Sequence, residues 1–140
     1  MIFIDTSVVV AASTVLDRRH DACVDVLATA DKRGGCCSIH SLAEIFNVLS
    51  GRPLPLRMSP VDAANVVAHT AQRFKTISLT ESEYVQVVEG LARLGHSGGM
   101  IYDALILACA RKSKATRIYT LNPRHFRLVA PDLAARIVEP

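Results

Sequence analysis

The chain has 140 residues, half of them hydrophobic and only 5% aromatic, and this length suits a single domain over residues 1–140. Its four cysteines form no C-x-x-C pair, which argues against a zinc site and against a disulfide framework. The N-terminal segment lacks a signal-peptide pattern and its apolar run is too short to span a membrane, so we expect a cytoplasmic protein without a membrane anchor.

The first third of the sequence predicts two strands and three helices. In chain order these are a strand at 2–4, helices at 6–14 and 20–34, a strand at 36–40 and a helix at 41–51. The first strand is an unbroken apolar run, which is typical of a strand covered on both faces. Thr6 or Ser7 is the expected N-cap of the first helix, and Ser41 opens the third.

The remaining sequence repeats this alternation. In chain order we expect a helix at 60–74, a strand at 75–80, helices at 81–95 and 98–115, a strand at 117–121, a helix at 123–129 and a last strand at 135–140. Ser59 and Thr80 are the expected N-caps of the helices that follow them, and Pro60 suits the first helical position. Strands separated by helices indicate an α/β fold of three layers, with a mainly parallel central sheet of four or five strands and helices on both faces.

Two polar residues follow predicted strands directly. Asp5 ends the first strand and Asn122 lies just past the fourth, so parallel strands would place both on the carboxyl edge of the sheet, where ligands gather. This position favours a functional role for Asp5, although its carboxylate could also cap the next helix. The alternative for Asn122 is an ordinary Asn-Pro turn.

Two further acids stand near helix starts. The neighbours of Asp103 in IYDALILACA are apolar around the whole helix, so its carboxylate needs a partner or a metal, unless it only complements the helix dipole. Ser41 and Glu44 form a capping-box pattern, which favours a structural role for Glu44. If Asp5, Glu44 and Asp103 converge, a divalent cation would offset their repulsion, and all-oxygen ligands select Mg²⁺ or Mn²⁺.

Four segments together are similar to a known family. The strand opening IFIDTS, the Ser-x-x-Glu in SLAEI, the acid in IYDALILACA and the strand-turn YTLNPRHF occur in this order over essentially the whole chain. This combination resembles the PIN-domain ribonucleases, and in particular the VapC-type toxins of bacterial toxin–antitoxin pairs. The resemblance implies a three-layer PIN-like fold and a metal-dependent endoribonuclease that hydrolyses RNA phosphodiester bonds, as the toxin of a type II pair.

The resemblance assigns the catalytic metal site to three acids. Asp5, Glu44 and Asp103 would bind Mg²⁺ or Mn²⁺, and the cation would activate a water and neutralise the leaving oxygen. Thr6 or Ser7 would orient Asp5 or a metal-bound water.

The resemblance also carries implications for partners and for the number of metals. The family often has a fourth acid where this chain has Asn122, which implies one firmly held cation and a second recruited with the substrate phosphate. Arg124 is the predicted RNA contact, and His125 is either a turn residue or another such contact. A homodimer and a cognate VapB-type antitoxin that covers the active site are further expectations.

Two other function classes stay open at this point. A PIN-like module that binds RNA or protein without cleaving is supported by the neutral Asn122. A receiver-like phosphoacceptor domain would need an acid at the end of the third strand, where KTISLT supplies none. A phosphatase with a D-x-D motif is disfavoured by the sequence Asp5-Thr6-Ser7.

Overall fold

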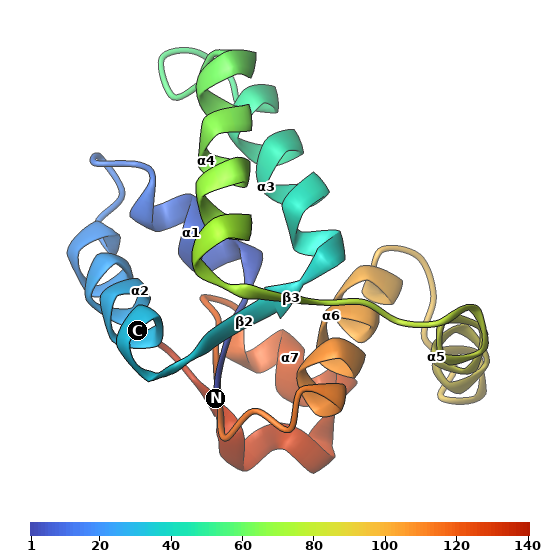
Figure 1. The fold of residues 1–140 in the computed structure, drawn as a ribbon. Helices are drawn as coiled ribbons and strands as arrows, with labels where there is room; N and C mark the ends of the chain where they lie inside the picture. The colour runs from blue at the N-terminus through green and yellow to red at the C-terminus, as the bar shows by residue number, and fades with distance from the viewer.

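The computed structural model describes residues 1–140 as a five-stranded sheet between helices (Figure 1). The strands are β1 (Ile2–Ile4), β2 (Gly35–Ser38), β3 (Lys75–Ile77), β4 (Arg117–Tyr119) and β5 (Ile137–Val138). Their order across the sheet is β3-β2-β1-β4-β5, and every neighbouring pair is parallel. The predicted α/β fold with a parallel central sheet is therefore confirmed.

Seven α-helices and one 3₁₀ helix connect the strands. They are α1 (Thr6–Ala12), α2 (His20–Arg33), α3 (Ile39–Gly51), α4 (Pro60–Arg73), α5 (Glu81–Arg93), α6 (Met100–Lys112), α7 (Pro123–Val129) and the 3₁₀ helix η1 (Pro131–Arg136). The sequence did not predict η1. None of the helices combines the length and the apolar character that a membrane-spanning segment requires.

The alternation of side chains along β1 builds a core on each face of the sheet. Ile2 and Ile4 pack on one face with buried residues of α1, α2, α3 and α4, whereas Phe3 packs on the other face with α6, α7 and η1 (Figure 1). All three side chains are buried, and each contributes about 1.5–3 kcal/mol through the hydrophobic effect. Both faces are thus covered, as the unbroken apolar run predicts.

The central position of β1 brings two chain segments together at its carboxyl end. Ile4 pairs with Tyr119 of β4, and the amide of Asp5 donates to the carbonyl of Tyr119 at 3.0 Å. Asp5 and Thr120, the residues that directly follow these two strands, therefore lie side by side. The shared edge expected for Asp5 and Asn122 follows from this pairing.

The first helix begins at Thr6 as predicted, but its N-cap and the start of α3 differ from the prediction. Asp5, not Thr6 or Ser7, is the N-cap of α1, because its carboxylate accepts from the Ser7 amide at 3.4 Å. The helix expected from Ser41 begins at Ile39. The hydroxyl of Ser38 accepts a hydrogen bond from the amide of His40 at 3.1 Å and so caps the helix.

The displaced start of α3 removes the predicted capping box. Ser41 lies inside the helix, and its hydroxyl is buried without a hydrogen-bond partner. The N-caps expected at Ser59 and Thr80 are confirmed, and Thr80 forms a complete capping box with Glu83.

Candidate active site

Asp5 is buried at the junction of β1 and α1, with 4% of its surface exposed. The hydroxyls of Ser7 and Thr120 both donate to Asp5 Oδ2, the latter at 2.9 Å. Asp5 Oδ1 accepts no hydrogen bond from the protein, although the residue lines a cavity. One carboxylate oxygen is therefore fixed and the other is free to bind a ligand.

The surroundings of Asp5 disfavour its negative charge. Burial raises the pKa of Asp5 from its usual 3.8 to about 6, the hydrogen bonds from Ser7 and Thr120 act against this rise, and the nearby charge of Glu44 adds to it. A positive charge close to Asp5 would stabilise the ionised form. The folded chain thus presents a carboxylate whose electrostatics favour a cation.

Glu44 lies on α3 and takes part in a contact between distant segments. The Thr6 hydroxyl at the start of α1 donates to Glu44 Oε2 at 2.6 Å, which joins residues 38 positions apart in the sequence. Oε1 has no hydrogen-bond donor within the protein. The structural role expected for Glu44 from the capping box is therefore replaced by a tertiary contact beside Asp5.

Asp103 lies in the first turn of α6 and is partly buried, with 24% of its side chain exposed. The Nδ1 atom of His125 on α7 contacts Asp103 Oδ2, and Oδ1 has no hydrogen-bond donor within the protein. The expected need for a partner is met by this histidine. Asn122, the N-cap residue of α7, lies one turn before His125.

The three acids and Asn122 line one cavity of about 290 Å³. The other residues that line it are Thr6, Ser7, Val10, Asp17, Arg19, Val48, Arg52 and Leu121. No three His, Cys, Asp or Glu side chains lie close enough to hold one metal ion directly. A cation here would take part of its ligands from water, as Mg²⁺ usually does in proteins.

The two hydroxyls next to Asp5 have different partners. Thr6 contacts Glu44, whereas Ser7 contacts Asp5 and also accepts the amide of Leu121 at 3.0 Å. Arg124 is exposed on α7 and is not among the residues that line the cavity.

Sequence reasoning missed Thr120 and Arg19. Thr120 ends the strand that pairs with β1, so its position next to Asp5 is visible once that pairing is known. Arg19 belongs to the connection between α1 and α2, and no local pattern marks it as part of the site.

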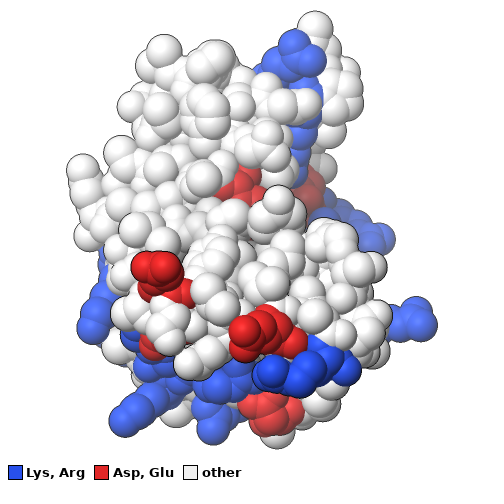
Figure 2. Space-filling view, turned by 90° about the vertical axis from the view of Figure 1, so that its right-hand side faces the viewer, with Lys and Arg blue, Asp and Glu red and all other residues white.

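Charged side chains are unevenly distributed over the surface of the molecule. Figure 2 shows acidic side chains in a recess of the surface, below a column of basic side chains that rises toward the top of the molecule. Arg19 and Arg52 are the basic residues that line the cavity itself. A cavity lined by both carboxylates and guanidinium groups suits a phosphate that is bound through a cation.

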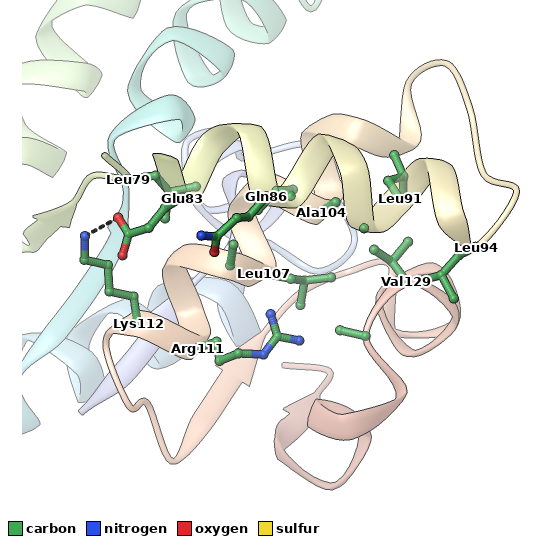
Figure 3. A pocket seen from close by; sticks show the side chains of 14 residues that line it. Leu79, Glu83, Gln86, Leu91, Leu94, Ala104, Leu107, Arg111, Lys112 and Val129 are labelled. Atoms are coloured by element: carbon green, nitrogen blue, oxygen red, sulfur yellow. Dashed lines mark hydrogen bonds and ion pairs between the residues drawn. The ribbon is translucent and has the colours of Figure 1, made fainter. Parts of the chain in front are cut away.

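A second hollow of about 470 Å³ lies between α5, α6 and α7 (Figure 3). Most of its lining is apolar, as illustrated by Leu79, Leu91 and Leu107. Its only acidic residue, Glu83, pairs with Lys112 at 2.6 Å (Figure 3). This hollow lacks the free carboxylates that hydrolytic chemistry would use.

Known proteins share both the sequence pattern and the fold. The PIN domain family model matches residues 2–130. Ribonuclease VapC27 of Mycobacterium tuberculosis is 34% identical over 112 residues, which cover 80% of this chain and 78% of that protein. Ribonuclease VapC40 of the same species is 32% identical over 116 residues, which cover 82% of each.

Solved structures agree with the fold. VapC20 of Mycobacterium tuberculosis, described as a sarcin-ricin loop cleaving toxin, superposes with a TM-score of 0.72 at 23% identity, over 89% of this chain and 92% of that one. VapBC2 from Rickettsia felis, bound to a DNA fragment from its promoter, gives a TM-score of 0.68 at 19% identity, over 99% and 98%. With a family model over most of its length and these relatives, the chain belongs to the PIN domain family and, within it, to the VapC ribonucleases.

Proposed function

We propose that this chain is a metal-dependent endoribonuclease and the toxin of a type II toxin–antitoxin pair. One observation carries the proposal: Asp5, Glu44 and Asp103, from three separate segments, line one cavity with one oxygen of each carboxylate held by a protein group. The names of the curated relatives, which are ribonucleases, support RNA as the substrate.

The donor set of the cavity fits a hard divalent cation. Three carboxylates with unengaged oxygens, and the amide oxygen of Asn122 in the same cavity, are the ligand types that Mg²⁺ and Mn²⁺ prefer. No cysteine lines the cavity, so softer metals lack their usual ligand. We therefore assign Asp5, Glu44 and Asp103 as the metal-binding residues, with at least one of them bound to the cation through water.

The residues of the chain have separable roles in this proposal. The bound cation would supply Lewis-acid activation of a water and neutralisation of phosphate charge. Ser7 and Thr120 orient Asp5, Thr6 orients Glu44, and His125 holds Asp103.

The basic residues would bind the substrate backbone. Arg52 has no acidic partner within ion-pair distance, whereas Arg19 pairs with Asp17 at 3.1 Å, so Arg52 is the better placed of the two for a phosphate. Arg124, on the helix that follows Asn122, is proposed as an additional RNA contact outside the cavity.

The proposed function includes partners. The related structure from Rickettsia felis is a VapBC complex, which supports a VapB-type antitoxin as the partner of this chain. Such an antitoxin would cover the cavity in a complex of the two proteins, with the toxin as a homodimer in the cytoplasm.

Cleavage of cellular RNA by purified, antitoxin-free protein tests the proposal. We expect discrete fragments with Mg²⁺ or Mn²⁺ and none with chelator. Asp5→Asn and Asp103→Asn should each lower the cleavage rate at least about 100-fold, since each removes a metal ligand. Asp25→Asn, an exposed acid on α2, is the matched control and should cut at the wild-type rate.

Two outcomes would contradict the proposal. Folded wild-type protein that binds RNA but cuts it with neither metal would favour a non-catalytic RNA-binding module. Cleavage that persists in chelator, or in both active-site variants, would exclude these carboxylates as the metal site.

A further inference from the structure

An aromatic pair, with Tyr102 exposed and His40 half-buried, lies on the two helices that carry Glu44 and Asp103. The rings of His40 on α3 and Tyr102 on α6 are stacked, with centroids 5.2 Å apart and planes 5° from parallel. Tyr102 directly precedes Asp103, and His40 lies one helical turn before Glu44. Each ring therefore sits on a helix that also contributes an acid to the cavity.

This pair is accessible at Tyr102, and its side-chain polar atoms have no hydrogen-bond partner within the chain. Tyr102 is 51% exposed, and neither its hydroxyl nor the ring nitrogens of His40 take part in a hydrogen bond within the protein. The chain has only three Tyr, four Phe and no Trp, so few aromatic rings are available for a surface contact. A stacked, half-exposed ring offers a flat apolar face to a planar ligand such as a nucleobase.

The side of α3 that carries His40 leads toward Arg52, the residue that follows the helix. His40, Glu44 and Val48 are spaced four residues apart, which places them along one side of α3 over about 12 Å, and Arg52 is the C-cap residue just past Gly51. Glu44, Val48 and Arg52 line the carboxylate cavity. We call these four residues the α3 stripe.

Arg52 is available at the far end of the α3 stripe. Its guanidinium donates to the Thr14 hydroxyl at 2.9 Å and pairs with no acid. It therefore keeps donors and a full positive charge for a phosphate. The α3 stripe thus offers a base-stacking surface, a carboxylate and a phosphate-binding group in this order.

Resting on the proposed nuclease function, we propose that single-stranded RNA binds along the α3 stripe. One base stacks on the Tyr102–His40 pair, the phosphate to be cut lies at the carboxylates, and a neighbouring phosphate is bound by Arg52. In a duplex the bases are already stacked and paired, so a base can reach this surface only from a single strand or a loop.

Binding without cleavage tests this path. The probe is a short single-stranded RNA with 2-aminopurine as one base, titrated in chelator at low salt, beside a version that lacks that base but keeps all phosphates. The 2-aminopurine fluorescence should fall on binding, because stacking on an aromatic ring quenches it. The abasic RNA should bind the wild-type protein about tenfold more weakly, the effect expected for one lost base–aromatic stack.

Variants assign the effect to residues. Tyr102→Leu should weaken binding of the intact RNA about tenfold, leave abasic binding unchanged and raise KM more than it lowers kcat, while Tyr102→Phe keeps wild-type affinity. Tyr84→Leu, at a tyrosine of similar exposure on α5, is the matched control and should have no effect. Arg52→Gln should reduce the dependence of log affinity on log salt by about 0.7, the value for one phosphate of a single strand.

The outcomes separate this inference from the proposed function. Equal binding of the abasic and intact RNAs by wild-type protein overturns the stacking surface, whether or not the enzyme cuts RNA, and this comparison needs no variant to fold. An unchanged salt dependence in Arg52→Gln overturns the phosphate contact. Failure of the nuclease function would show instead as wild-type protein that cuts no RNA with either metal.

Discussion

Replacement of Asp5 by Asn should make the metal-free protein more stable at neutral pH. Wild-type Asp5 is buried and its pKa is raised to about 6, mainly by loss of hydration. The neutral amide has nearly the same shape, and its oxygen can accept the hydrogen bonds that Ser7 and Thr120 give to Asp5 Oδ2. The variant therefore keeps the contacts and loses the buried charge.

The size of the effect follows from proton linkage. The unfolded chain releases the Asp5 proton near pH 3.8 and the folded chain near 6, so folding is favoured by this group below pH 3.8 and the gain is lost as the pH rises through 6. At roughly 1.4 kcal/mol per pH unit, the difference corresponds to about 3 kcal/mol of unfolding free energy above pH 6. The Asp5→Asn substitution should restore most of this unfolding free energy.

Urea unfolding in chelator, over about pH 4 to 8, measures this difference. The wild-type unfolding free energy should decline relative to the variant between pH 4 and 6.5, and the gap should narrow when saturating Mg²⁺ is added, because the cation stabilises only the wild-type folded state. An Asp5→Asn protein that is less stable than wild type near neutral pH, with a parallel pH profile, would refute the reasoning.

Three further substitutions probe the site and the core. Thr120→Val removes a donor to Asp5, so it should raise the pKa of Asp5 further and lower the unfolding free energy in urea by about 1 kcal/mol. Gly35→Ala would put a Cβ 2.5 Å from a ring carbon of the buried Phe74, and urea unfolding should show a loss of about 1–3 kcal/mol. Asn122→Asp adds a carboxylate to the proposed ligands Asp5, Glu44 and Asp103, so calorimetric titration should show Mn²⁺ bound about tenfold more tightly; unchanged affinity would place residue 122 outside the metal site.

The order of strands and helices could be predicted because local signals mark most of the elements. The unbroken apolar run of β1, the Ser59 cap with its proline and the Thr80–Glu83 capping box each depend on residues close in sequence. The shared edge of Asp5 and Asn122 followed from the expectation of parallel strands, which needs topology but no side-chain detail.

The start of α3 could not be predicted because two serines compete for the cap. The Ser-x-x-Glu pattern at Ser41 matches a capping box, but the hydroxyl of Ser38 caps the helix one turn earlier. The side chain of Glu44 therefore makes no capping hydrogen bond to the backbone and accepts one from the Thr6 hydroxyl instead. The role of Glu44 is thus decided by a tertiary contact between residues that are far apart in the sequence, which a local sequence pattern cannot reveal.

Thr120 and Arg19 could not be predicted as site residues for a related reason. Thr120 reaches Asp5 across 115 positions, and Arg19 enters the cavity from a connection between helices. Neither has a sequence pattern of its own, since a Thr at a strand end and an Arg in a loop are common. Strand pairing brings Thr120 to Asp5, and the path of the connection between α1 and α2 brings Arg19 to the cavity.

The charges of the proposed ligands limit the number of cations that they can hold. Asp5, Glu44 and Asp103 carry at most three negative charges, Asn122 adds none, and Asp17, which also lines the cavity, is paired with Arg19. One divalent cation leaves these ligands with a net negative charge, whereas two would make the same group positive beside the guanidinium of Arg52. A substrate phosphate brings the missing negative charge. We therefore infer one resident cation in the free enzyme and a second site that fills only together with RNA.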